Sequence, residues 1–209
     1  MIQIITADNR HLFHHQLMEM HRQRKQVFID QLRWPLEDIA GVEIDCFDCP
    51  EATYLVDING ATGEVAGSTR LLPTNRPHLL GDVFPYLCDD APPSGDHIWE
   101  ATRFCPAPDI PKGEPRRAFL ARMIAAIIET ALLFGIERVT FVAGAALAPS
   151  ATRAGWNVTP LGSARRVGRD RLRAFAADID CAGLRAVRAQ NQIAAPATRF
   201  MSASIAKAA

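Results

Sequence analysis

Ionised side chains interrupt segments of this chain that otherwise have the apolar pattern of a protein core. They lie in the first half of the chain, with a tryptophan among them: Arg24, Trp34, Asp45, Asp48, Arg70, Glu100 and Arg103. Charged groups are almost never buried alone, because removing one partner of a buried pair costs about 3–5 kcal/mol. The fold must therefore bring these charges together. They predict a structural network or, as the balance of signs favours, a site for a small zwitterionic, cationic ligand.

The composition predicts a single globular domain. The chain of 209 residues is long enough for one large core, and a formal net charge of zero gives no general attraction to nucleic acid. The N-terminus has no secretory pattern, and the longest apolar run, residues 123–136, is too short to span a bilayer. We expect one cytoplasmic domain over residues 1–209, with a frayed tail from about residue 195.

The cysteines and histidines do not form a set of metal ligands in the sequence. Cys46 and Cys49 make a single C-x-x-C, and no second pair completes the four ligands of zinc. His11 and His15 lie four residues apart on a predicted helix, without an acidic companion. We therefore expect no metal, and the odd count of five cysteines indicates reduced thiols.

An arginine lies on the apolar face of the first predicted helix. Residues 2–5 have the pattern of a strand, and Asp8 or Asn9 can cap a helix that extends to about Phe28. Apolar residues recur along this helix at helical spacing, and Arg24 falls on the same stripe. An arginine in that position needs an acidic partner from a later segment.

Residues 30–50 predict a functional loop. They have no regular periodicity, yet they are too apolar for a solvated linker. A loop of this length is uncommon in a compact domain and is often functional. It carries Trp34 and the two acids Asp45 and Asp48, which are the expected partners of Arg24.

Three strands are predicted after this loop. Residues 52–58 and 64–72 form a hairpin through a turn that contains Asn-Gly, and residues 97–105 form the third strand. A regular strand would place Glu100 and Arg103 on opposite faces, because their spacing is odd. We hypothesise a β-bulge between them, which would return both to one face.

The remaining pattern alternates helices and strands. We expect a crossing loop at 73–96, a helix from Pro115 to about Phe134, a strand at 139–143, a helix at 145–154, strands at 156–161 and about 165–169, and a weak helix at about 180–192. This order predicts an α/β protein in which a mixed sheet carries helices on its faces.

A series of short motifs runs along the chain in a fixed order. They are R-x3-F at Arg24 and Phe28, Trp34, D-x2-D at Asp45 and Asp48, S-T-R-L-L-P around Arg70, D-V-F-P at Phe84, W-E-A-T-R-F around Glu100 and Arg103, R-x-G-W at 153–156, and Leu161-Gly162. The set resembles the acyl-homoserine-lactone synthases, the autoinducer synthases of bacterial quorum sensing. The resemblance covers nearly the whole chain and implies a single-domain, N-acetyltransferase-like α/β fold.

The resemblance also implies an acyltransferase reaction with two substrates. An acyl group would pass from a thioester of acyl carrier protein or coenzyme A to the amine of S-adenosylmethionine. The methionyl carboxylate would then close the lactone ring and release methylthioadenosine. Both compounds are substrates, so no cofactor is expected.

The charges of S-adenosylmethionine suit the residues singled out above. Its ammonium, carboxylate and sulfonium need both acidic and basic partners. The expected catalytic residues are Glu100, Arg103, Asp45 and Arg70, and the expected substrate-binding residues are Arg24, Phe28, Trp34, Asp48, Phe84, Phe141, Val142 and Trp156. Glu100 is the candidate base, directly or through a water molecule. Trp34 can cover the sulfonium, whereas simple packing explains Phe28 and Phe84 equally well.

An apolar slot is expected to hold the acyl chain. Its candidate residues are Met123, Ile127, Phe141, Val142, Ala146, Leu147 and Trp156, although each is also an ordinary core residue. Family members that make 3-oxo products often carry a hydroxyl group near Phe141, where this sequence has Ala143 and Gly144. We therefore expect an unsubstituted, branched or aromatic acyl group. Arginines at 116–117 and 165–173 could meet either thioester carrier, or form a solvated basic face.

Two other functions are compatible with the same residues. The first is a coenzyme-A-dependent N-acyltransferase that acts on another amine. Such enzymes commonly have a glycine-rich turn after the central strand, and residues 106–115 contain only one glycine. The second is a non-catalytic sensor of S-adenosylmethionine. Release of methylthioadenosine would distinguish the three.

Overall fold

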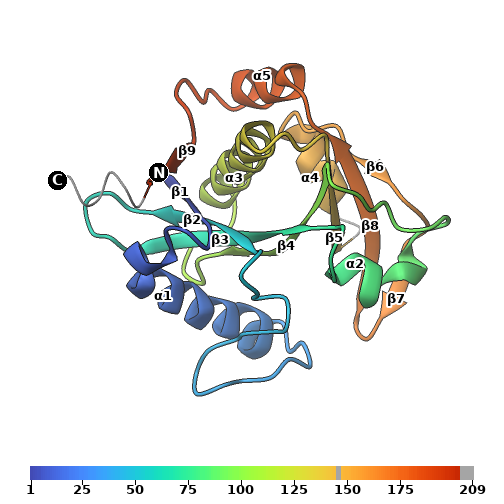
Figure 1. Ribbon diagram of the computed structural model, residues 1–209, viewed down its shortest axis with the longest axis horizontal. Helices are drawn as coiled ribbons and strands as arrows, with labels where there is room; N and C mark the ends of the chain where they lie inside the picture. Colours follow the sequence, from blue (N-terminus) through green and yellow to red (C-terminus); the bar gives the residue numbers. More distant parts are fainter. Residues whose placement is uncertain (145–146, 203–209) are drawn as a thin grey trace.

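The computed structural model describes residues 1–144 and 147–202 (Figure 1). The strands are β1 Ile2–Ile5, β2 Thr53–Ile58, β3 Val65–Pro73, β4 Ile98–Pro106, β5 Arg138–Gly144, β6 Thr159–Pro160, β7 Arg165–Val167, β8 Asp170–Asp178 and β9 Thr198–Phe200. The α-helices are α1 His14–Arg24, α2 Leu79–Asp82, α3 Glu114–Leu133, α4 Leu147–Arg153 and α5 Cys181–Gln190. Shorter helical segments are η1 Arg10–Leu12, η2 Lys25–Gln31 and η3 Pro85–Leu87, and η2 has π-helical geometry.

The strands form one mixed sheet flanked by helices, which confirms the predicted α/β class. Their order is β6-β8-β5-β4-β3-β2-β1-β9, with β7 paired to β8. The pairs β4–β5 and β1–β9 are parallel, and the other described pairs are antiparallel. Helix α1 covers one face of the sheet, and α3 and α5 cover the other (Figure 1).

The main core lies between the sheet and α3. Pro115 occupies the first turn of this helix, where its missing N–H is not needed. Gly135, with a φ of +70°, follows its last turn. Ile124 and Ile127 of α3 are buried in this core. No described helix is long and apolar enough to cross a membrane.

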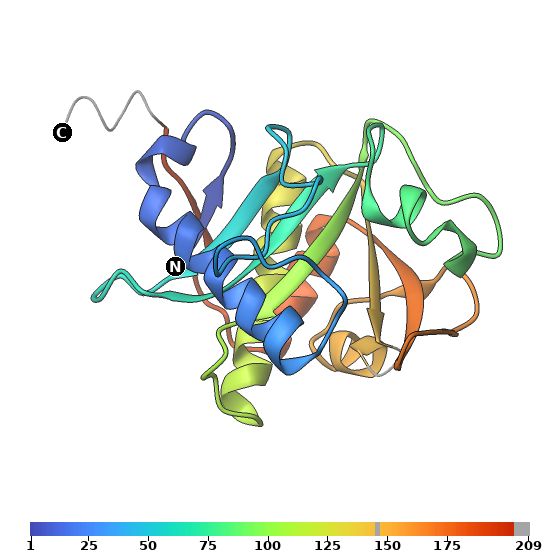
Figure 2. The same cartoon turned by 90° about the horizontal axis from the view of Figure 1, so that it is seen from below.

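The central strands β4 and β5 diverge at one end of the sheet. Their parallel pairing ends at Ala101 and Phe141, although β4 continues to Pro106 and β5 to Gly144. Beyond this point β5 remains paired with β8, and β4 with β3. Figure 2 shows the two strands separating. The divergence divides the sheet into a β1–β4 half and a β5–β8 half.

The first helix begins later than predicted, because Asn9 does not cap it. The buried Asn9 amide donates to the carbonyl oxygens of Ile4 and Met201 at 3.0 and 2.9 Å. Its oxygen accepts the Thr6 N–H at 2.8 Å, and α1 starts only at His14. The side chain thus connects both ends of the chain, which a local capping pattern does not reveal.

Strand β8 does not appear among the strands predicted from the sequence. Four consecutive residues of this strand, 174–177, are buried, so the alternation of buried and exposed residues that usually marks a strand is absent there. The strand predicted at 156–161 is reduced to Thr159–Pro160. Burial on two faces explains the missed β8 but not the shortened strand, because Thr159 and Pro160 are both exposed.

Two segments predicted to be irregular contain ordered elements. The crossing loop at 73–96 includes α2 and η3. The tail predicted as frayed contributes β9, whose residues 198–200 pair in parallel with β1. This part of the tail prediction is wrong, because β9 completes the edge of the sheet. Residues 203–209 lie outside the described range.

Candidate active site

A β-bulge in β4 brings Arg103 to the face of the sheet that carries Arg70 and Glu100. The antiparallel register of β3 and β4 shifts between Ser68 and Arg70, which leaves one extra residue in β4. Arg103 has a φ of +52°, a left-handed conformation uncommon for a residue with a side chain. Its guanidinium contacts Asp45, the carboxylate that also pairs with Arg70. The hypothesised bulge is therefore confirmed.

Arg24 is bound by two carboxylates beneath this face. Its Nη1 and Nη2 donate to both oxygens of Asp48 at 2.8 and 2.9 Å. Its Nε donates to Glu43 Oε2 at 2.5 Å. Arg24 and Glu43 are each 1% exposed, so this arginine has the acidic partners that its place on the helix stripe requires.

Arg70 and Arg103 extend the same network. Arg70 donates to both oxygens of Asp45, at 2.5 and 3.0 Å, and its Nη1 lies 2.8 Å from Asp48. Arg103 Nη2 lies 2.9 Å from Glu43 and 2.7 Å from Asp45. Every carboxylate of this network contacts two guanidiniums. We call these six residues the charged network: Arg24, Arg70, Arg103, Glu43, Asp45 and Asp48.

Glu43 belongs to the charged network although it was not among the predicted site residues. It takes the place that we assigned to Glu100 as the third acid of the network, by bridging Arg24 and Arg103. One signal was available in the sequence, because Glu43 precedes Asp45 by two residues in an E-x-D-x2-D pattern. Alternating acids in an extended segment point to the same side.

Hydrogen bonds within the loop at 30–50 and attraction between opposite charges fix the position of Asp48 in the charged network. Asp48 accepts the Asp45 backbone N–H and the Tyr54 hydroxyl, each at 2.8 Å. Burial alone would raise the pKa of Asp48, but Arg24 and Arg70 hold it well below its usual range. Asp48 is therefore a fixed anion, around which the acidic loop folds as a tight turn.

Only one edge of the charged network reaches solvent. The side chains of Asp45 and Arg103 are 17% and 6% exposed, whereas the other four members are at most 3% exposed. A ligand can therefore contact Asp45 and Arg103 directly. Arg24, Asp48, Arg70 and Glu43 support those two from below.

Glu100 lies apart from the ion pairs. Its Oε1 accepts the Leu80 N–H at 2.9 Å, and its buried Oε2 has no hydrogen-bond partner among the described residues. Burial raises the pKa of Glu100 to about 7, despite the opposing influence of the α2 backbone N–H groups and of Arg70. A carboxyl with this pKa can exchange a proton near neutral pH.

A hydroxyl group does lie near Phe141, contrary to the sequence interpretation. Thr140 is fully buried and pairs with Glu100 in the parallel ladder of β4 and β5, so both side chains lie on one face. Its Oγ1 is 3.5 Å from the Trp99 carbonyl oxygen. The argument against 3-oxo chains, which considered only Ala143 and Gly144, therefore fails on geometry.

An aromatic stack borders the exposed edge of the charged network. The rings of Phe28 and Trp34 are stacked, with centroids 4.9 Å apart and planes inclined by 16°. The guanidinium of Arg103 lies 5.6 Å from the centroid of Phe28. The indole N–H of Trp34 donates to Asp170 Oδ2 at 3.1 Å. Phe28 thus lies beside Arg103, and Trp34 is joined to Arg103 through Phe28.

The other four predicted binding residues divide between two faces of the sheet. Phe141 and Trp156 stack at 5.3 Å within the main core on the α3 side. Val142 and Phe84 pack in a separate cluster around Leu80. Neighbouring residues of a regular strand point in opposite directions. A single slot therefore cannot hold both Phe141 and Val142, and Ala146 lies outside the described residues.

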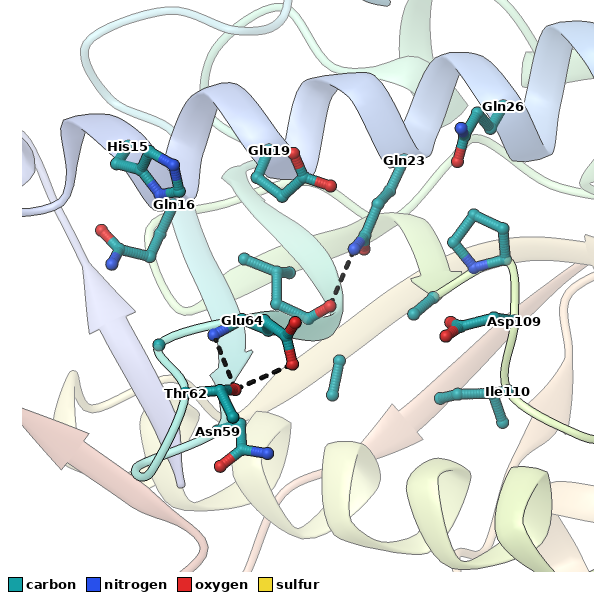
Figure 3. Close-up of a pocket in the computed structure, with 15 residues that line it drawn as sticks. His15, Gln16, Glu19, Gln23, Gln26, Asn59, Thr62, Glu64, Asp109 and Ile110 are labelled. Carbon is teal, nitrogen blue, oxygen red and sulfur yellow. Dashed lines mark hydrogen bonds between the residues drawn. The ribbon is translucent and has the colours of Figure 1, made fainter.

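A polar groove of about 720 Å³ lies on another side of α1 (Figure 3). Gln16, Glu19 and Gln23 of the helix face Asn59 and Glu64 of the β2–β3 hairpin across it. Its lining contains none of the charged network. Among described residues, no group of three or more His, Cys, Asp or Glu is arranged to hold a metal ion.

Comparison with known proteins links this geometry to a family. The autoinducer synthase family model matches residues 8–187. The chain is 34% identical over 164 residues to the isovaleryl-homoserine lactone synthase of Bradyrhizobium diazoefficiens, covering 78% of this chain and 72% of that protein. It resembles the structure of BjaI, a CoA-dependent acyl-homoserine lactone synthase with SAM and isopentyl-CoA, with a TM-score of 0.88 and 30% identity over 100% and 98% of the chains. A putative N-acetyltransferase from Lactobacillus plantarum shares the fold, at 16% identity and a TM-score of 0.54 over 86% and 99%.

Proposed function

This chain belongs to the autoinducer synthase family and is an acyl-homoserine-lactone synthase, and from this premise we propose the substrates and the residues of its reaction. The amine acceptor is S-adenosylmethionine, and the acyl donor is a thioester of coenzyme A. Coenzyme A is proposed over a carrier protein because the related BjaI structure contains SAM and isopentyl-CoA. The observation that carries the mechanism is the buried carboxyl of Glu100 beside the charged network.

Glu100 is the proposed base for the acyl transfer. The ammonium of S-adenosylmethionine must lose a proton before its nitrogen can attack a thioester carbonyl. Glu100 has an unpartnered Oε2 and a pKa of about 7, which match that task. The nitrogen then bonds to the carbonyl carbon and the carbon–sulfur bond breaks. The second nitrogen proton goes to the departing sulfur, so that an amide and a free thiol are formed.

The exposed edge of the charged network is the proposed binding site for the amino-acid part of S-adenosylmethionine. Asp45 would contact the ammonium, and Arg103 the carboxylate. Trp34 and Phe28 would lie against the sulfonium, since a cation over an aromatic face gains about 0.5–2 kcal/mol. Arg24, Asp48 and Arg70 would act by fixing Asp45 and Arg103.

Lactone closure needs no further reagent. A carboxylate oxygen of the acylated intermediate bonds to the carbon beside the sulfonium, and the carbon–sulfur bond breaks. The electron pair remains on sulfur, so methylthioadenosine leaves as a neutral thioether. Arg103 would orient the attacking carboxylate.

The proposed acyl group is short and branched or unsubstituted. One relative is a synthase of isovaleryl-homoserine lactone, and the BjaI structure holds isopentyl-CoA. In this chain Phe141 stacks on both Trp156 and Phe175, which fills space that a longer chain would need. Phe84 and Val142 would line the opposite face, nearer to Glu100.

The test is the release of methylthioadenosine by the purified protein. We expect it with S-adenosylmethionine and isovaleryl-CoA together, with an N-acyl-homoserine lactone detected by mass spectrometry, and not with either compound alone. Acyl carrier protein loaded with the same group serves as the alternative donor. Release of free thiol without methylthioadenosine would indicate an N-acyltransferase for another amine. Binding without any product would indicate a sensor.

A further inference from the structure

A series of contacts connects the two diverging halves of the sheet. It begins on the β4 side, where the Arg103 guanidinium lies over the Phe28 ring and Phe28 stacks on Trp34. It ends on the β5–β8 side, where the Trp34 indole donates to Asp170. Asp170 begins β8 and lies two residues before Leu172, the first residue of this strand that pairs with β5. The aromatic stack therefore crosses the gap that β4 and β5 leave open.

The backbone of Trp34 is set by the end of the π-helical segment η2. The Trp34 N–H donates to the Phe28 carbonyl oxygen, six positions earlier, at 2.9 Å, which is one residue wider than the closure that commonly ends an α-helix. Arg33 provides the left-handed turn that this closure needs, with a φ of +58°. Local structure thus places the indole on Phe28, but it does not hold the outer end of the ring.

We infer that Asp170 is a positioning residue that holds the Trp34 indole across the gap and so makes the β7–β8 hairpin part of the substrate site. The inference rests on the proposed function, in which Trp34 covers the sulfonium of S-adenosylmethionine. The indole N–H has only one proton to donate, and Asp170 accepts it at 3.1 Å. Without this acceptor the ring loses the hydrogen bond that joins it to the β5–β8 half.

The ligand-free protein provides a first test that needs no turnover. The chain has three tryptophans, so a proton–nitrogen correlation spectrum contains three indole signals, and Trp34→Phe identifies one by its loss. We expect Asp170→Ala to shift this signal and to speed its exchange with solvent. Asp170→Asn keeps a carbonyl acceptor and should leave the signal near its original position. An unchanged Trp34 signal in Asp170→Ala would refute the inference, whatever the substrate is.

Kinetics provide the second test. Loss of one exposed hydrogen bond should raise the KM for S-adenosylmethionine about threefold to tenfold in Asp170→Ala, with kcat changed by less than about twofold. Either substitution removes the hydrogen bond between Trp34 and Asp170. The part of the rise in KM that comes from this bond should therefore not increase when Trp34→Phe is added to Asp170→Ala. Asp178→Ala is the matched control, since Asp178 is an exposed aspartate on the same strand. An unaltered KM with a shifted indole signal would also overturn the positioning role.

Discussion

At the scale of single residues, two buried glutamates perform different tasks because their neighbours differ. Glu43 contacts the guanidiniums of Arg24 and Arg103 and is at most 1% exposed, so its charge is compensated within the charged network. Glu100 accepts a backbone N–H and keeps one oxygen without a described partner. Burial then makes ionisation of Glu100 unfavourable. The first glutamate braces the site, and the second is available for proton transfer.

Glu100→Gln should abolish the rise of kcat/KM with pH that comes from ionisation of Glu100. In the unaltered enzyme, kcat/KM should rise with pH through a midpoint of about 7, because the base acts only when ionised. The variant should lose this midpoint and about 10²- to 10⁴-fold in rate. Glu137→Gln, at an exposed position, should behave like the unaltered enzyme. A near-full rate in Glu100→Gln would remove Glu100 from its proposed role.

The raised pKa of Glu100 also predicts how stability changes with pH. The rate should rise with pH, whereas the contribution of Glu100 to the free energy of unfolding should fall. The folded state binds a proton more tightly than the unfolded state between about pH 4.5 and 7, so Glu100 weakens the fold as pH rises through that range. Glu100→Gln should therefore be more stable than the unaltered protein at pH 8, by up to about 3 kcal/mol, and lose this advantage at pH 4. Urea unfolding at the two pH values measures the difference.

Glu43→Ala should destabilise the protein strongly. The change leaves Arg24 and Arg103 each short of one carboxylate in a buried setting, which costs about 3–5 kcal/mol. Glu37→Ala alters an exposed glutamate of the same loop and should change the unfolding free energy by less than about 0.5 kcal/mol. Equal urea midpoints for the two variants would show that Glu43 is not a brace.

At the scale of elements, departures from regular geometry bring the charges together. The bulge in β4 puts Arg103 at a φ of +52°, which costs about 1–2 kcal/mol. The ion pairs of Arg103 with Glu43 and Asp45 offset that cost. The segment η2 follows α1 directly but has the wider turns of a π-helix. Phe28 lies in this segment, and its ring contacts Arg103. Such irregularities are common at functional sites.

Gly67→Ala tests how tightly β3 and β4 meet α3 near the bulge. An added Cβ would lie 2.5 Å from the Phe119 ring and 2.7 Å from the Cys105 carbonyl oxygen, at a φ of +145°. We expect a loss of about 2–5 kcal/mol in the free energy of unfolding. Gly60→Ala, in the same hairpin but with open space around it, is the control and should change little. Similar melting temperatures for both variants would contradict this packing.

At the scale of the whole molecule, the site lies where segments distant in sequence meet. The β1–β4 half supplies the charged network, and the β5–β8 half supplies Asp170 and the pairing partner of β4. The two ends of the chain also meet, because β9 pairs with β1 and Glu129 of α3 accepts the N–H groups of Ala197 and Thr198. The proposed substrate site therefore depends on contacts between both halves of the sheet.

Glu129→Gln tests the attachment of β9. Hydrogen bonds from Ala197 and Thr198 and the charge of Arg188 lower the pKa of Glu129, against the effect of burial. Glu129 therefore stabilises the fold above about pH 4.5, and this contribution is lost as pH falls. We expect the variant to lose about 1–3 kcal/mol at pH 7, with faster amide exchange in β9. Glu114→Gln on the same helix is exposed and should show neither effect. Unchanged exchange in β9 would show that Glu129 does not hold it.

The sequence by itself determined the family, the α/β class and most members of the charged network. Arginine on an apolar stripe and acids in an apolar loop must find each other, because a lone buried charge is too costly. This reasoning finds Arg24, Asp45 and Asp48, and the odd spacing within β4 even predicts the bulge that turns Arg103.

Only the tertiary structure decided which acid meets which arginine and which face each side chain occupies. Glu43, which lies in the loop, takes the place of Glu100 in the charged network, and strand register makes Thr140 a neighbour of Glu100. Strand β8 escaped prediction because both of its faces are buried, which erases the alternation on which strand prediction depends. Register and burial arise from contacts between distant segments, and local patterns along a chain do not contain them.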